Sequence, residues 1–210
     1  MKIRFACTLL LAASVVLAVP ISAATLYSDG PVNGTIAGYT IGGPYAVSNS
    51  FNIGGSSVIT GFDAGIWAAE GDVPVQVDWA IGTTFFASDI ASGTAILSST
   101  LFCLSCGPLN MSDIYTSTAT GLNVPVAGGT YYFSLFHAID STSAVFLWDE
   151  NDGPSQAEQL QTGFGTHPIG SESFNIYGNA VTSTPEPGTV MMLGTGLLGM
   201  LRKVRLTSKA

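Results

Sequence analysis

The stretch VPVQVDWAI, residues 73–81, decides the fold class. Its apolar residues occupy every second position, and Pro, Gln, Asp and Ala stand between them. Because successive side chains of a strand point to opposite faces, this alternation predicts a strand of an antiparallel sheet with one buried face. The residues predicted to share that face are Val73, Val75, Val77, Trp79 and Ile81.

The same period of two recurs between Thr25 and Thr184, and no stretch of ten residues in this window carries the 3.6-residue period of an amphipathic helix. Clusters of Gly, Pro, Asn and Asp separate the alternating segments as turns. About eight or nine short strands predict an all-β domain over residues 25–181, a single antiparallel β-sandwich that is jelly-roll-like. Besides 73–81, strands are predicted over 47–53, 58–67, 94–104, 130–139, 144–148 and 173–177.

The N-terminus has the pattern of a secretion signal. Lys2 and Arg4 precede a mainly apolar run over residues 5–19, and Ser22-Ala23-Ala24 offers the small residues that a signal peptidase needs. Residues 1–24 are therefore predicted to be a signal peptide, cleaved after Ala24 or, alternatively, after Ala23.

The C-terminus, a linker and tail over residues 182–210, predicts a second membrane segment. Residues 188–201 carry no charge, and a basic end over 202–210 follows directly. As a helix the apolar run would be about 21 Å long, short of the roughly 30 Å hydrocarbon core, so we expect transient anchoring in the inner membrane. The positive-inside rule places the basic end in the cytoplasm and the domain outside.

Basic and acidic residues are distributed unequally between the domain and the two ends of the chain. All six Lys and Arg residues lie outside the window from Thr25 to Thr184, whereas thirteen of the fourteen acidic residues, all except Glu186, lie inside it. A domain of this charge repels nucleic acid and anionic lipid, so no nucleic-acid partner is expected. Its carboxylates have no Lys or Arg partner and must meet water, neutral hydrogen-bond donors or bound cations.

Cys103 and Cys106 are the two cysteines that remain when the signal peptide, with Cys7, is removed. Export to an oxidising compartment favours a local disulfide between them. A haem site would need His after the second cysteine, where Gly107 stands, and a zinc site would need two further ligands.

The PEPG sequence at 185–188, the apolar segment and the basic end together resemble the PEP-CTERM sorting signal of Gram-negative bacteria. This resemblance implies that the tail is recognised and cleaved by a membrane-embedded exosortase, and that the protein reaches the cell surface or the extracellular space. Members are typically linked to exopolysaccharide, biofilm or floc matrices. Residues 129–135 with Trp148 resemble the jelly-roll domains often attached to such tails. The residues that carry the sorting resemblance are Pro185, Glu186, Pro187, Gly188, Arg202, Lys203 and Arg205.

Two further features suggest ligands of the domain. Asp149, Asn151 and Asp152 form an oxygen-rich loop that is a calcium candidate, although its spacing does not fit the EF-hand pattern. A solvated Asn-Asp-Gly turn is the simpler interpretation. Trp67 is a candidate for stacking on a sugar ring, with packing under a loop or at a sheet edge as the simpler interpretation. No other cofactor is expected.

The sequence lacks the patterns of common enzymes. The nucleophile-elbow pattern G-x-S-x-G is absent, and His137 follows an alternating strand that predicts a core or interface position. We therefore predict a non-enzymatic structural or adhesive protein of the extracellular matrix. The alternative is a carbohydrate-binding module for exopolysaccharide, and an enzyme ranks third. A dominant exposed apolar patch would favour the adhesive function.

Overall fold

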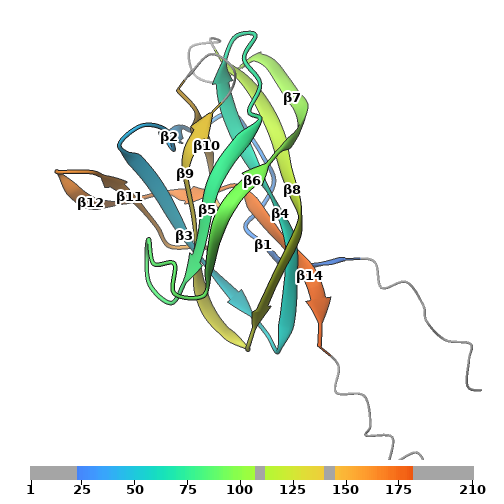
Figure 1. Cartoon of the computed structure of the whole chain (residues 1–210). Helices are drawn as coiled ribbons and strands as arrows, with labels where there is room; N and C mark the ends of the chain where they lie inside the picture. The colour runs from blue at the N-terminus through green and yellow to red at the C-terminus, as the bar shows by residue number, and fades with distance from the viewer. Residues whose placement is uncertain (1–22, 107–111, 140–144, 182–210) are drawn as a thin grey trace, which may run out of the picture. The chain divides into compact units, whose positions relative to one another are not determined.

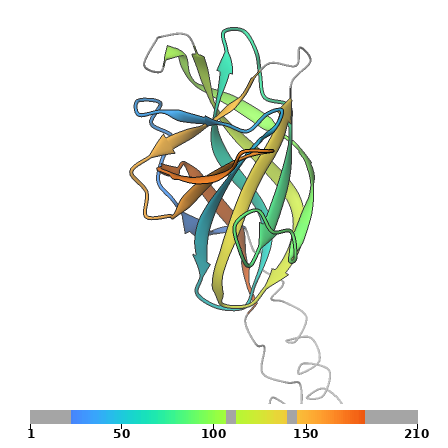
Figure 2. The same cartoon turned by 90° about the vertical axis from the view of Figure 1, so that its left-hand side faces the viewer.

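The computed structural model describes residues 23–106, 112–139 and 145–181. The regular structure in these ranges is β-strand, arranged in two antiparallel sheets (Figure 1, Figure 2). The chain divides into two units after Ala180, and all of these strands belong to the first unit. No helix in the described ranges is long and apolar enough to cross a membrane. Residues 1–22 of the predicted signal peptide and the whole predicted sorting helix lie outside those ranges.

The first sheet has eight strands and is organised around the long strand β4. β8 pairs with β4 along its whole length, while β14 and β10 pair with successive parts of its other side. β7 pairs with β8 and forms the outer margin of this sheet (Figure 1). The strands are β1 (Ala24–Ser28), β2 (Gly38–Thr40), β4 (Ser57–Ala69), β7 (Ser98–Cys106), β8 (Ser112–Val126), β10 (Leu147–Asn151), β13 (Ser171–Glu172) and β14 (Phe174–Ala180).

The second sheet has six strands in the order β12-β11-β3-β9-β5-β6. Its hairpin β11–β12 projects away from the body of the domain in Figure 1. Connections along the chain often cross between sheets, as from β3 to β4, β4 to β5, β6 to β7 and β8 to β9. The strands are β3 (Tyr45–Ile53), β5 (Gln76–Gly82), β6 (Ala91–Ile96), β9 (Gly129–Ile139), β11 (Ala157–Gln161) and β12 (Gly165–Ile169).

An aromatic cluster joins the two sheets face to face. Phe62 of β4 and Phe133 of β9 have ring centroids 4.8 Å apart, and Phe133 also contacts Trp148 and Phe174, each at 5.6 Å. All four side chains are buried. Such aromatic pairs add about 0.5–1.5 kcal/mol each to the stabilisation that burial of their area provides. The core of the domain is therefore the space between the sheets, as the alternating sequence pattern requires.

The prediction of an all-β fold with antiparallel sheets is confirmed, but the strand predicted over residues 73–81 begins later than predicted. Val77, Trp79 and Ile81 are buried in β5, whereas Val73 and Val75 precede the strand and are 42% and 44% exposed. Pro at position 74 has no N–H to donate to a ladder, which is consistent with this late start.

The single strand predicted over 94–104 is wrong, because the chain changes sheets within it. β6 ends at Ile96 and β7 begins at Ser98, in the other sheet. Leu97 between them is buried, and its N–H donates to the carbonyl oxygen of Val75 at 2.9 Å. The buried Leu97 continues the apolar alternation from β6 into β7. The sequence pattern therefore does not reveal that the chain changes sheets here.

The sequence analysis missed β8, the longest strand, and the shorter strands β1, β2, β11, β12 and β13. The inward positions of β8 include Ser117 and Ala119, which are fully buried although one is polar and the other small. Inward positions held by a polar and a small residue do not show the large apolar side chains by which the other strands were predicted. The close approach of β8 restricts β4 instead, since a Cβ at Gly61 would come within 2.5 Å of the Ala119 carbonyl oxygen.

Two phenylalanines test the aromatic cluster. Phe133→Ala is expected to lower the free energy of unfolding by about 3–5 kcal/mol, because a fully buried aromatic side chain leaves a cavity. Phe164→Ala, at an 84% exposed position, is the matched control and should change it by less than about 0.5 kcal/mol. Urea unfolding measures both values, and similar losses in the two variants would contradict this account of the core.

Candidate functional site

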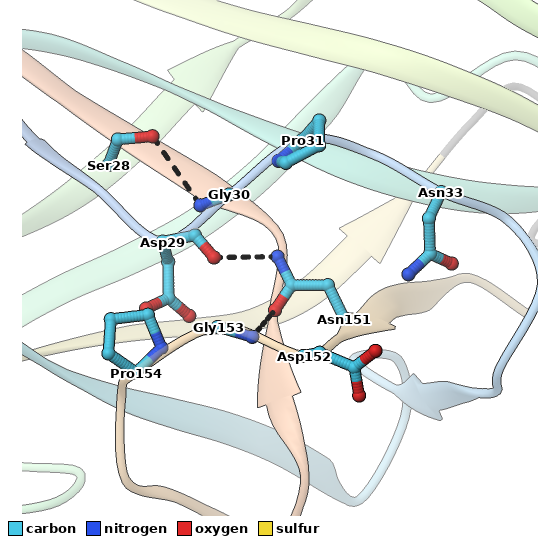
Figure 3. A pocket seen from close by; sticks show the side chains of 9 residues that line it. All are labelled: Ser28, Asp29, Gly30, Pro31, Asn33, Asn151, Asp152, Gly153 and Pro154. Carbon is cyan, nitrogen blue, oxygen red and sulfur yellow. Dashed lines mark hydrogen bonds between the residues drawn. The ribbon is translucent and has the colours of Figure 1, made fainter.

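A pocket of about 480 Å³ lies between the segment that follows β1 and the turn that follows β10 (Figure 3). Asn151 joins the two segments, because its amide nitrogen donates to the carbonyl oxygen of Asp29 at 2.8 Å. Its amide oxygen accepts the N–H of Gly153 at 2.9 Å, which shapes the turn. The side chains around the pocket are mostly polar, with Ser28, Asp29 and Asn33 on one segment and Asn151, Asp152 and Pro154 on the other.

Asp29 is fully buried beside this pocket and is well supplied with hydrogen-bond donors. Its carboxylate accepts the hydroxyl of Tyr27 at 2.7 Å, and both the N–H and the hydroxyl of Ser155 at 3.1 and 2.9 Å. The hydroxyl of Ser171 donates to it as well. Burial raises the pKa of Asp29, and these hydrogen bonds partly oppose that rise.

Asp149 is also fully buried, and it ties three parts of the first unit together. Its carboxylate accepts the backbone N–H groups of Asn33 and Gly34 at 2.9 and 3.0 Å and the indole N–H of Trp67 at 2.6 Å. Burial raises the pKa of Asp149, while the hydrogen bonds act in the opposite direction. The interpretation of this segment as a wholly solvated turn is therefore wrong for Asp149.

The calcium candidate from the sequence does not form a common site. Asp149 points toward Trp67 and the loop at Asn33, Asn151 is buried and bridges to Asp29, and Asp152 is exposed. Among the described residues, no three His, Cys, Asp or Glu side chains are grouped so that they could hold a metal ion.

Trp67 does not offer a platform for a sugar. Its side chain is only 5% exposed, and its indole N–H is used by Asp149. The expectation that Trp67 could stack on a carbohydrate is therefore wrong, because stacking needs an accessible ring face. The simpler interpretation, a Trp packed beneath a loop, fits its contact with the carboxylate that holds Asn33 and Gly34.

Asp29, Asp149, Glu150 and Glu172 form an acidic cluster, of which Glu150 and Glu172 stand out chemically. They are direct partners in the β10–β13 ladder. Glu172 is fully buried, and neither of its carboxyl oxygens has a hydrogen-bond partner among the described residues. Burial raises its pKa well above the ordinary value, and the charges of Glu150, Asp149 and Asp29 add to the rise. Burial also raises the pKa of Glu150.

The sequence analysis overlooked Asp29 and Glu172, although it contained a signal for Glu172. Phe174 and Ile176 alternate on the buried face of the predicted strand over 173–177. Continuing that alternation two residues toward the N-terminus places Glu172 on the same buried face. No comparable signal exists for Asp29, whose burial depends on Ser155 and Ser171 meeting it from distant segments.

His137 lies on the surface rather than in the core. Its side chain is 60% exposed, and its Nδ1 lies 3.1 Å from Oδ2 of Asp78. β9 has one extra residue here, since Gln76 and Asp78 of β5 pair with Ile139 and Phe136, and His137 adopts a φ of 50°. This bulge interrupts the alternation from which the buried position was predicted.

Cys103 and Cys106 are joined by a disulfide near the end of β7, with Cα atoms 6.0 Å apart. Ser105 between them has a φ of 50°, and its N–H donates to the carboxylate of Asp113 at 2.9 Å. The pair and Asp113 together fix the end of the edge strand.

The acidic cluster predicts an unusual pH dependence of stability. A carboxyl group whose pKa is raised by folding is protonated in the folded protein at a pH where the unfolded chain has lost the proton. The free energy of unfolding, measured by urea titration in a chelating buffer, should therefore fall as pH rises from about 4.5, the ordinary value for Glu. Glu172→Gln cannot ionise and should make this fall shallower.

Glu70→Gln is the matched control, because Glu70 is an exposed glutamate in the turn between β4 and β5. It should leave the pH profile of the wild type unchanged. A stability that rises from pH 4.5 to 8, or a profile that Glu172→Gln does not alter, would rule out the buried carboxyl as its source.

A family model described as the PEP-CTERM protein-sorting motif matches residues 183–205. This match supports the predicted sorting signal, and it falls outside the residues that the structure describes. A search of curated proteins found no match to the chain. The motif implies processing by an exosortase-type enzyme, and the chain is thus an exported protein that is sorted through its C-terminal tail and anchored transiently in the membrane.

Proposed function

We propose that the β domain is a non-enzymatic structural or adhesive component of the cell surface or extracellular matrix, delivered there by signal peptidase and exosortase processing. The sorting motif supports delivery to the outside. The frequent crossing of the chain between the two sheets supports a jelly-roll-like sandwich as the architecture of the delivered domain.

The observation that carries the adhesive function is the apolar edge formed by β7. Leu101, Phe102 and Leu104 are 47%, 51% and 65% exposed on this strand, and Ile96, just before it, is 72% exposed. The strand's sequence, SSTLFCLSC, contains no charged residue. An edge strand normally carries Lys, Pro or a charge that prevents pairing with another chain, and β7 has none of these.

The partner that best fits this edge is β7 of a second copy of the chain. Antiparallel pairing of two identical strands is self-complementary, so one interface satisfies the exposed backbone groups of both copies. Thirteen carboxylates elsewhere in the domain repel a second copy at most other orientations. The neutral edge is therefore the surface where two copies meet at the lowest electrostatic cost.

Trp67, the candidate residue of the carbohydrate-binding alternative, is buried. The tryptophans at 67, 79 and 148 are all buried, which removes the most effective side chains for stacking on a sugar. We therefore retain exopolysaccharide only as a component of the matrix in which the protein would act.

Self-association through β7 is the first test of this function. Leu104→Ser should weaken concentration-dependent association of the purified domain by at least about tenfold, because it removes an exposed apolar contact from the edge. Phe164→Ser removes an even more exposed apolar side chain from the turn between β11 and β12 and serves as the control. Analytical ultracentrifugation measures both. A wild-type domain that stays monomeric, or equal losses in the two variants, would refute pairing at this edge.

Processing is tested separately by the intact mass of the protein recovered from its native host. The mature chain should begin near Thr25 and lack residues 202–210, because the sorting motif is expected to be cut from its apolar segment and basic end. Replacing Pro185, Glu186 and Pro187 with Ala should leave the tail in place. Recovery of the complete C-terminus from wild-type cells would contradict processing while leaving the test of β7 unaffected.

A further inference from the structure

We propose that Glu150 and Glu172 form a binding site for a divalent cation, calcium, where β10 and β13 pair. The two residues are direct partners in an antiparallel ladder, so both side chains leave the same face with Cβ atoms about 4.5–5.5 Å apart. Trp148, two residues before Glu150, shows that this is the face toward the core. Two like charges in this arrangement destabilise a sheet unless something neutralises them.

The carboxylate of Glu172 lacks the partners that its neighbours have. Asp29 accepts hydrogen bonds from Tyr27, Ser155 and Ser171, and the carboxylate of Asp149 accepts three N–H groups. Both oxygens of the fully buried Glu172 are without a partner among the described residues. Hydrogen bonds therefore satisfy the buried carboxylates of Asp29 and Asp149, as they do that of Asp113, and leave Glu172 open.

Protonation alone would not resolve this situation. A proton would remove the charge of Glu172, but its two oxygens would still lack hydrogen-bond partners in the interior, which is costly for any buried polar group. A cation bound by both oxygens removes the charge and supplies the missing partner at once. The domain offers no Lys or Arg side chain for this purpose, since none lies between Thr25 and Thr184.

The carboxylate of Glu150 lies against the backbone of Gly170, where a Cβ would collide with its Oε1 atom. Glu150 is half-buried whereas Glu172 is fully buried, so the pair extends from the surface into the interior. The partly exposed Glu150 is therefore the ligand through which the proposed site meets solvent.

The donor set selects the class of cation. Carboxylate oxygens without sulfur or imidazole favour a hard ion over zinc or copper. Calcium takes six to eight oxygen ligands in flexible geometry, including water, whereas magnesium demands a near-ideal octahedron. Because no three acidic, His or Cys side chains in the described ranges are placed so that together they could hold a metal ion, neutral oxygens and water must complete the shell. Two carboxylates predict a Kd of about 10⁻⁴–10⁻³ M, as in extracellular calcium modules.

Thermal unfolding tests the site in the exported chain. About 10 mM calcium chloride should raise the Tm of the wild type by about 3–10 °C above the value in sodium chloride of equal ionic strength. Glu172→Gln and Glu150→Gln should abolish the calcium-specific rise. Gln has the shape of a protonated Glu, so Glu172→Gln is expected to fold. Glu70→Gln and Asp152→Asn each remove one carboxylate outside the pair and should retain the rise.

Terbium, a luminescent substitute for calcium, gives a second readout that does not depend on stability. Emission excited through Trp148 should appear with the folded wild type and be lost in Glu172→Gln. Equal Tm shifts from both salts in the wild type would overturn the proposal and leave Glu172 as a protonated buried acid. A calcium effect lost in Asp152→Asn but kept in Glu172→Gln would also overturn it, because it would place the ion in the loop after β10.

Discussion

The structure depends on burying carboxylates in a domain that has no Lys or Arg. A buried charge is normally paired with an opposite charge, and no Lys or Arg between Thr25 and Thr184 can supply one. Asp29, Asp113 and Asp149 are instead surrounded by backbone N–H groups, hydroxyls and one indole. Each of them therefore acts as a hub to which several neutral segments are attached, and their positions determine where the loops of the domain lie.

These hubs account for the order of segments that have little apolar side chain to bury. Asp149 holds the loop at Asn33 and Gly34, and Asp113 holds Ser105 and the turn at Gly71. Truncating Asp149 would leave the N–H of Gly34 and the indole N–H of Trp67 without partners in buried positions, so the loss would exceed that of one hydrogen bond. The acidic composition thus contributes to the fold as well as to the surface charge.

Sequence periodicity predicted the sheets and their buried face because Val47, Phe51, Phe133 and Ile81 are large apolar residues at regular spacing. It failed where the chain departs from that spacing or fills the core with small residues. The crossing at Leu97 is invisible to periodicity, and β8 is concealed because a polar residue, Ser117, and a small one, Ala119, occupy its inward positions. The acidic site needed three-dimensional pairing, since Glu150 and Glu172 are neighbours only through their ladder.

The pairing of β1 with β14 has a mechanical consequence. Ala24 lies opposite Gly178, so both ends of the described domain emerge at the same end of one sheet. Tension applied through the C-terminal segment would run along the axis of β14, which is flanked by β1 and by β4. The hydrogen bonds on both sides of the strand would then be loaded in shear and bear that tension together, instead of breaking one after another. A strand held in this way resists being pulled out of its sheet. This is an advantage in a domain that is sorted through its C-terminal segment.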